Sequence, residues 1–318
     1  MKIPEKEYKS ILDREKNIKD FNDNFSDAQK LLIDIVNYGT NLIPRCFVSS
    51  SRKQADAILL GVLLKQIVTM LDSAEVLISN GCIYPSKLQT RALFEASIYI
   101  DFILKSETEK KALYYYVSNL RIDRLWALRT MGESPDQEIF DSILLNMGKD
   151  MLEKSRAKYD LGKLEYDSIN DLLSKDIFKE IDEEFDKYKK DNKLKFEPNW
   201  YNLFKYKSIR AIAQDLGRIH EYEFFYSMAS DVTHTSRYKD HIRTENGKII
   251  FKRIRSLEGI KGELNILIAT TLKTYGLILE KYRPGEIQNF KRKYINEWRE
   301  IFFKTPSVKY NIEEFEVI

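Results

Sequence analysis

Two segments of the chain carry polar residues whose types and spacing could do chemistry. Arg91 and Glu95 lie one helical turn apart in the apolar run RALFEASIYIDFIL. In EFFYSMASDVTH, Tyr226, Ser230 and His234 recur at steps of four, which places them in a row on one helix face. Because buried charges must be paired or hydrogen-bonded, we predict that the two helices meet in one polar cluster.

The chemistry of such a cluster would be acid–base chemistry beside an anion. Glu95 facing the imidazole of His234 could form a general acid/base pair, and Arg91 could hold a phosphate or carboxylate. The candidate catalytic set is therefore Arg91, Glu95 and His234. The supporting polar residues are Tyr226, Ser230 and Glu223.

Two other interpretations of the same residues are open. Polar networks in a core often fix packing rather than do chemistry, and we favour this structural role over catalysis. Asp231 with His234, and His220 with Glu223, have the i, i+3 spacing of metal-binding helices. Carboxylate-bridged sites need several inward carboxylates from four helices, and the sequence offers no second well-supported set on a buried face. We therefore predict no metal and no cofactor.

The composition indicates a soluble globular protein. The chain has 318 residues, 12% aromatic and 32% charged, with a net charge of only +3, so a nucleic-acid-binding field around the whole protein is not implied. Cys46 and Cys82 lack a CxxC spacing, so the sequence suggests neither a zinc site nor a disulfide framework. The N-terminus lacks a secretion signal, and no stretch approaches the ~18 uncharged apolar residues of a membrane span. We expect a cytoplasmic protein without a membrane partner.

Helical periodicity runs through almost the whole chain, which predicts an all-α fold: a multi-helix bundle with an acidic helical insertion and one small β-hairpin. The first helices are expected to end near Gly39, and the helix carrying Arg91 is expected to be central because it is apolar nearly all round. The predicted parts are N-terminal helices at 1–50, half of the bundle at 51–132, the acidic insertion at 133–197 and the second half at 198–318.

The C-terminal part combines a hairpin signal with basic residues. Asn246-Gly247, between alternating segments, predicts a β-hairpin at about 242–254. Residues 237–310 hold 17 Lys and Arg against 8 Asp and Glu, whereas 133–197 hold 12 against 18. Basic side chains among aromatics could grip nucleic acid, although an ordinary lysine-rich surface is the favoured interpretation. The candidate nucleic-acid-binding residues are Arg243, Lys248, Lys252, Arg253 and Arg255.

The C-terminal helix, at about 285–304, has its own apolar stripe. Steps of three and four join the residues of this stripe, which predicts a packing surface that buries Trp298 against the body or a second subunit. The stripe consists of Ile287, Phe290, Tyr294, Trp298 and Ile301. A homodimer is expected.

The motifs together resemble domain-of-unknown-function family 5677, a helical bacterial family. The resemblance rests on an Arg-x-x-x-Glu helix at Arg91 and Glu95, a tryptophan-led segment at Trp200 and the Tyr-x-x-x-Ser-x-x-x-His helix from Tyr226 to His234. It covers roughly residues 55–280, with 133–197 the least matched part. The resemblance implies a helical bundle and no established activity.

A broader likeness is to the HEPN superfamily, whose ribonuclease members use an arginine and a later histidine with four to six residues between them. The pairs in this chain depart from that spacing: Arg210 and Arg218 before His220, and Arg237 before His241. At the family level we expect a helical binding or sensor module of a bacterial intracellular system, in phage defence or mobile-element conflict, with a protein partner. The alternative is a HEPN-like nuclease or toxin acting on RNA through His234 with Arg91 and Glu95. Whether the protein is an enzyme is left open.

Overall fold

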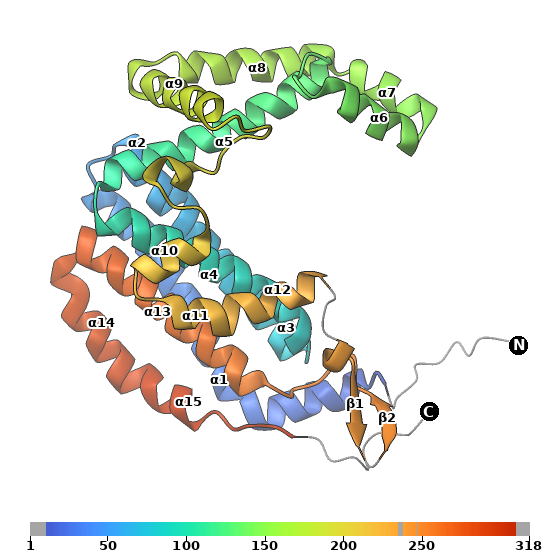
Figure 1. The fold of residues 1–318 in the computed structure, drawn as a ribbon. Helices are drawn as coiled ribbons and strands as arrows, with labels where there is room; N and C mark the ends of the chain where they lie inside the picture. Colours follow the sequence, from blue (N-terminus) through green and yellow to red (C-terminus); the bar gives the residue numbers. More distant parts are fainter. Residues whose placement is uncertain (1–10, 235–237, 246, 310–318) are drawn as a thin grey trace, which may run out of the picture. The chain divides into compact units, whose positions relative to one another are not determined.

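The computed structural model describes residues 11–234, 238–245 and 247–309. Within these ranges the side chains of Lys149, Met228, Asp231, His234, Glu245 and Lys248 lie outside the description. The chain forms two compact units, one from Met1–Ser106 with Ile209–Ile318 and one from Glu107–Ser208. The predicted all-α class is confirmed, since the described residues are mostly helical and contain one two-stranded sheet (Figure 1).

Four long helices form the core of the first unit. Helix α4 packs against α3 and α13, and α1 packs against both of those helices, so apolar faces meet from every side. The prediction that the Arg91 helix is central is therefore confirmed. The four helices are α1 (Arg14–Ser49), α3 (Leu64–Ser79), α4 (Ile83–Lys105) and α13 (Ile260–Tyr282).

Helix α1 corrects the expected helix end at Gly39. It runs on through Gly39 and Pro44 to Ser49. Gly39 faces α13 there: a Cβ atom at this position would lie 2.0 Å from the hydroxyl oxygen of the fully buried Tyr275. Glycine at position 39 therefore permits a close helix–helix approach and does not end the helix.

The stretch before α4 is strongly apolar. Helix α2 (Gln54–Ile58) continues into α3 through a π-helical turn at Leu59–Leu63. By length and composition alone, Gln54–Ser79 could cross a membrane, with a mean hydropathy of 1.6 over its most apolar window. Core helices share this property, and half of that window is buried within the fold. The absence of a membrane span stays a prediction.

Short elements return the chain across α4 after the second unit. They are α10 (Ile209–Asp215), α11 (Ile219–Glu221), a π-helical turn (Tyr222–Tyr226) and α12 (Ser227–His234). The predicted hairpin follows, as antiparallel strands β1 (Ile242–Glu245) and β2 (Lys248–Phe251), with Ile242 opposite Phe251 and Glu245 opposite Lys248.

The last helices, α14 (Ile287–Lys293) and α15 (Arg299–Lys304), lie along α13 and α1 (Figure 1). Trp298, which is 1% exposed, donates its indole N–H to Asp34 of α1 at 2.6 Å and meets the Tyr38 ring edge-on. The predicted burial of Trp298 is confirmed, and the surface that buries it is the body of the same chain.

The described residues of the second unit form helices joined by short non-helical segments, with no strand among them. Helices α8 (Tyr159–Leu173) and α9 (Asp176–Asp191) pack along the long helix α5 (Thr108–Met131). In the sequence, α6 (Gln137–Met147) and α7 (Lys149–Arg156) come between α5 and α8. A 3₁₀ turn at Trp200–Phe204 also contacts α5. The acidic segment predicted at 133–197 lies within this unit, which also takes in α5.

Candidate functional sites

The predicted polar cluster brings together three of its proposed members. Tyr226, from the π-helical turn, bridges Arg91 and Glu95 on α4. Its hydroxyl accepts a hydrogen bond from Arg91 Nη2 at 3.2 Å and donates one to Glu95 Oε2 at 3.3 Å. The Arg91 guanidinium also lies over the Tyr226 ring, 4.7 Å from its centroid. The predicted contact between these two parts of the chain is therefore present.

Two residues that the sequence did not single out complete the cluster. Arg91 Nη1 donates to the Thr233 hydroxyl at 3.1 Å, and Tyr99 donates to Glu95 Oε1 at 3.2 Å. Both follow from helical spacing, since Tyr99 lies four residues after Glu95 and Thr233 lies seven after Tyr226. Burial raises the pKa of Tyr226, and Arg91 opposes that rise only partly, so the phenol stays protonated and can bridge.

The other predicted members are distributed differently. Glu223 pairs with Arg210 at 2.7 Å on an exposed surface rather than with Arg91. Ser230 is half-buried on α12. His234 ends α12, and its side chain lies outside the described residues, so the proposed Glu95–His234 pair stays a prediction. The described hydrogen bonds connect the π-helical turn to α4, because Arg91 and Glu95 share the hydroxyl group of Tyr226.

Replacing Tyr226 with phenylalanine tests how much these hydrogen bonds contribute to the free energy of unfolding. Tyr226→Phe keeps the ring under Arg91 but removes the hydroxyl that both charged groups use. We expect the free energy of unfolding, measured by urea titration, to fall by about 1 kcal/mol, or more if Arg91 and Glu95 find no water. Tyr222→Phe is the matched control, because Tyr222 stacks on Tyr226 at 4.8 Å and its hydroxyl is outside the cluster. Equal stability of both variants would show that the hydroxyl bridge contributes nothing.

A second buried network, centred on Arg218, was not predicted. The Arg218 side chain is 1% exposed and contacts α4 and α11. It donates twice to Glu221 Oε2, at 2.9 and 2.6 Å, and once to Ser97 Oγ at 3.0 Å. The sequence drew attention to Arg218 only through its spacing to His220, and one arginine between Gly217 and a short helix carries no burial signal.

The basic residues predicted to bind nucleic acid lie on and just after the hairpin. Their described members, Arg243, Lys252, Arg253 and Arg255, are all half-buried, and the Lys248 side chain lies outside the described residues. Lys252 and Arg253 line a cavity at the start of α13. No interaction with nucleic acid is tested by this geometry, which stays a prediction.

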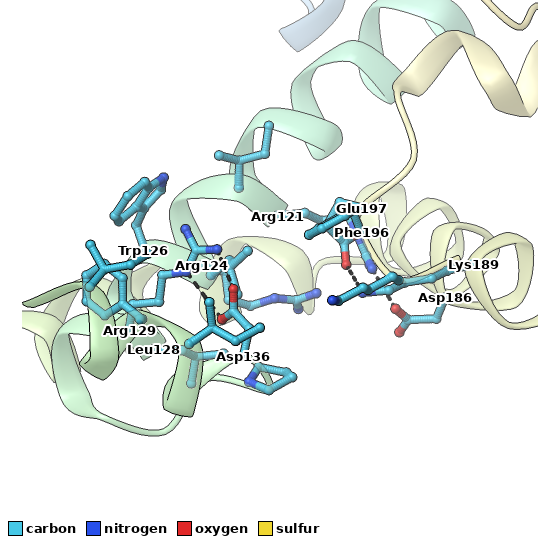
Figure 2. Close-up of a pocket in the computed structure, with 17 residues that line it drawn as sticks. Arg121, Arg124, Trp126, Leu128, Arg129, Asp136, Asp186, Lys189, Phe196 and Glu197 are labelled. Atoms are coloured by element: carbon cyan, nitrogen blue, oxygen red, sulfur yellow. Dashed lines mark hydrogen bonds and ion pairs between the residues drawn. The ribbon is translucent and has the colours of Figure 1, made fainter. Parts of the chain in front are cut away.

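The second unit contains the largest of five cavities that we describe, a groove of about 770 Å³ (Figure 2). Helices α5 and α6 supply most of its lining, and the segment after α9 adds Phe196 and Glu197. Arg129 pairs with Asp136 at 2.5 Å, and its guanidinium lies 4.6 Å from the centroid of the Trp126 ring. Besides Trp126 and Phe196, the apolar lining comes from Ile122, Leu125, Leu128, Pro135, Ile139, Phe140 and Ile143.

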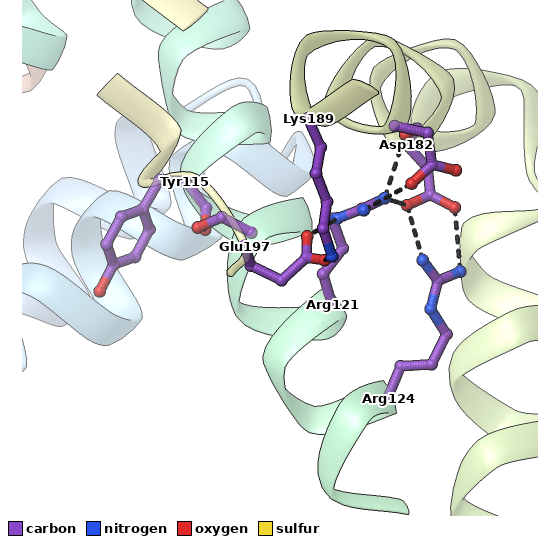
Figure 3. Close-up of polar contacts among 8 residues, drawn as sticks. Tyr115, Arg121, Arg124, Asp182, Lys189 and Glu197 are labelled. Carbon is purple, nitrogen blue, oxygen red and sulfur yellow. Dashed lines mark hydrogen bonds and ion pairs between the residues drawn. The ribbon is translucent and has the colours of Figure 1, made fainter. Parts of the chain in front are cut away.

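One end of the groove is fixed by ion pairs around Arg121 (Figure 3). The Arg121 side chain, 4% exposed, donates to Asp182 and, at 2.6 Å, to Asp186 on α9, and to Glu197 at 2.8 Å. Arg124 binds both oxygens of Asp182 at 3.0 Å, and Lys189 reaches Glu197 at 2.6 Å. We call these residues the Arg121 clamp: Arg121, Arg124, Asp182, Asp186, Lys189 and Glu197.

Metal chemistry has no support among the described side chains, where no group of three or more His, Cys, Asp and Glu could hold an ion. The side chains of Asp231 and His234, which have the spacing of a metal-binding pair, lie outside the described residues. Neither Arg91, Glu95 nor Tyr226 lines any of the five cavities.

Comparison with known proteins leads to one family. The model of a family of unknown function, DUF5677, matches residues 56–249, which includes α4, the second unit and the Tyr226 helix. Neither curated proteins nor solved structures give a match. The likeness to the HEPN superfamily has no match behind it. Since the family model covers more than half of the chain and spans the motifs on which the resemblance rests, the chain belongs to the DUF5677 family.

Proposed function

We propose that the protein is a helical binding module and that the groove of the second unit receives an amphipathic helix of a partner protein. The observation that carries this proposal is the apolar stripe on α6. Ile139, Ile143 and Met147 recur at steps of four and are each at least half exposed. Monomeric proteins rarely leave contiguous apolar surface open unless something binds there.

The extent of the stripe favours a helix over a small molecule. Ile139 and Ile143 line the groove, but Met147 continues the stripe beyond the lining residues. On the facing side, Ile122 and Trp126 of α5 and Phe196 are also largely exposed. A small ligand would fill the cavity and leave the rest of the stripe in water. A helix with anchors at steps of three and four would cover both.

The charges around the groove indicate what flanks that apolar face. The lining holds five cations and three carboxylates, and most of these charges pair with one another in the Arg121 clamp or as Arg129 with Asp136. Lys195 is exposed beside Phe196, and its ammonium group lies 5.6 Å from that ring. Asp182 also pairs with Arg121 and Arg124, so the exposed Lys195 is the cation that favours a partner with an acidic residue beside its apolar stripe.

A site-specific photo-crosslinker tests the proposal. The full-length protein would carry benzoylphenylalanine at position 143 or, as the matched control, at the exposed Glu138 on the same helix. We expect one polypeptide to crosslink in native cells from position 143 and not from 138. A synthetic peptide of the crosslinked segment should bind the wild type, and Ile143→Glu should weaken its affinity at least tenfold, measured by calorimetry. Equal crosslinking from both positions, or equal affinity for both proteins, would contradict the proposal.

The RNA-cleaving alternative through His234 has weaker support. Tyr226 engages both Arg91 and Glu95, and neither residue lines a described cavity, so a phosphate has no preformed place beside them. The described contacts favour architecture there.

A further inference from the structure

A cleft at the start of α13, in the first unit, is separate from the proposed partner groove. It has a volume of about 370 Å³ and is lined by three segments distant in sequence: α4, the chain after β2, and the first turn of α13. We propose that this cleft binds the phosphate group of a small organic phosphate. The proposal goes beyond the partner-binding function and does not depend on it.

Cationic side chains reach the cleft from two of these segments. Lys87 comes from α4, and Lys252 and Arg253 follow β2. Neither Lys87 nor Lys252 forms an ion pair with a described carboxylate, and the Lys87 ammonium lies 5.5 Å from the centroid of the Tyr84 ring. Asp240 and Glu258 also line the cleft, so its lining contains both cationic and acidic side chains.

The third segment adds backbone donors. Helix α13 begins after Gly259, whose φ of +83° and missing side chain leave the first turn without a side-chain cap. Among the described residues, the amides of Lys261 and Gly262 have no backbone acceptor, and a Cβ atom at Gly259 or Gly262 would meet nothing within 4 Å. The 23-residue helix thus presents N–H groups and its positive end to the same open space.

One buried carboxyl group, that of Glu263, also lines the cleft. Glu263 is 5% exposed and accepts a hydrogen bond from Thr90. Burial raises the pKa of Glu263, and the hydrogen bonds from Thr90 and Ser86 and the charge of Lys87 only partly offset that rise. A carboxyl group whose pKa is raised is a weaker counter-charge to the nearby Lys87 than an ordinary carboxylate would be.

An adjoining cavity indicates the organic part of the ligand. It has a volume of about 160 Å³, shares Lys87, Glu263 and Ile266 with the cleft, and is otherwise lined mainly by apolar residues, including Phe224 and Phe225. Together the two spaces fall within the range of small-molecule sites, roughly 300–1,000 Å³. An aromatic or apolar group attached to the phosphate would fit beside the phenylalanines, as in a mononucleotide.

The test is Gly262→Asp in the full-length protein. Aspartate in the first turn favours the helix start, so the fold should be as stable as the wild type or more so, but the new charge would repel an anion. We expect adenosine monophosphate to bind the wild type and to lose at least tenfold in affinity in Gly262→Asp and severalfold in Lys252→Gln, measured by calorimetry. Lys65→Gln, on an exposed face of α3, is the charge-matched control and should bind as the wild type does.

Two further probes identify the source of the phosphate. Weaker binding of inorganic phosphate than of adenosine monophosphate would support the role of the apolar cavity. Binding of a short oligoribonucleotide that Gly262→Asp abolishes would place the end of an RNA strand in the same cleft. Absence of binding by all three probes at millimolar concentration, or equal affinity of the wild type and Gly262→Asp with a melting temperature that shows both are folded, would overturn the proposal.

Discussion

Replacing Arg121 with alanine is expected to lower the free energy of unfolding of the second unit by about 3–5 kcal/mol, because it removes the buried cation that two partly buried carboxylates share. Arg121 joins three acidic side chains, Asp182, Asp186 and Glu197, from α9 and the segment after it. Asp186 is two-thirds exposed and contributes little, so Asp182 and Glu197 carry most of the effect.

The location and the matched control make this result specific. Urea unfolding of the full chain gives the size of the loss, and hydrogen exchange shows whether the amides of α9 and of residues 194–198 exchange faster. Lys154→Ala removes an exposed ion pair with Asp150 in the same unit and should change stability by less than about 0.5 kcal/mol. If Arg121→Ala were as mild as this control, the clamp would not hold α9 in place.

The effect should also depend on pH in a defined direction. Burial alone would raise the pKa of Glu197, but hydrogen bonds and charge from Lys189 and Arg121 outweigh it and hold the pKa below its ordinary value. A carboxyl group whose folded pKa is depressed stabilises the fold above its unfolded pKa of about 4.3 and loses that contribution as pH falls through the folded value. The difference between wild type and Arg121→Ala is therefore expected to shrink below about pH 4.

Helical patterning was sufficient to predict the parts of this fold that depend on local periodicity. The central position of α4 and the packing of Trp298 follow from apolar spacing, and the hairpin follows from Asn246-Gly247. The contact between α4 and the Tyr226 helix was predictable because buried charges need partners, and Arg91 and Glu95 are in an otherwise apolar helix. The error at Gly39 has the opposite cause, since only the tertiary fold shows that Tyr275 approaches there.

The groove and the two arginine networks could not be predicted from the sequence. In the 133–197 segment, charges alternate with apolar residues as they do on any solvated helix, so nothing distinguishes Asp182 from its acidic neighbours. Arg121 lies on α5 among other basic residues, and its burial depends on how α9 folds back on α5. Ion-pair partners more than fifty residues apart cannot be recognised in a single sequence when each belongs to a residue type that is common on surfaces.

Arg218→Met is expected to lower the free energy of unfolding of the first unit by about 3–5 kcal/mol. Methionine keeps much of the length of the arginine stem but removes every donor. Among its described ion-pair partners, Glu221 would keep Lys273, at 3.1 Å, and Asp101 would lose a contact at 3.4 Å. Ser97, which also accepts a hydrogen bond from Thr274 at 2.9 Å, would no longer connect α4 and α13 to the Arg218 guanidinium.

A double variant separates the lost ion pair from lost packing. Removing both charges is less costly than stranding one, so Arg218→Met with Glu221→Gln should recover part of the stability lost in Arg218→Met alone. Lys105→Met, which breaks a more exposed pair with Asp215, is the control and should have a small effect. If the double variant were no more stable than the single one, packing over the Phe94 ring, 5.2 Å from the guanidinium, would account for the loss.

The single variant Arg218→Met also tests what holds the Tyr226 cluster in place. Arg218 immediately precedes α11, and the chain from there to Tyr226 is anchored on α4 by Arg218 at one end and by Tyr226 with Arg91 and Glu95 at the other. Loss of the first anchor should loosen the second, so hydrogen exchange of residues 219–233 is expected to speed up in Arg218→Met. Faster exchange confined to residues near 218, with α12 unchanged, would show that the Tyr226 cluster holds α12 by itself.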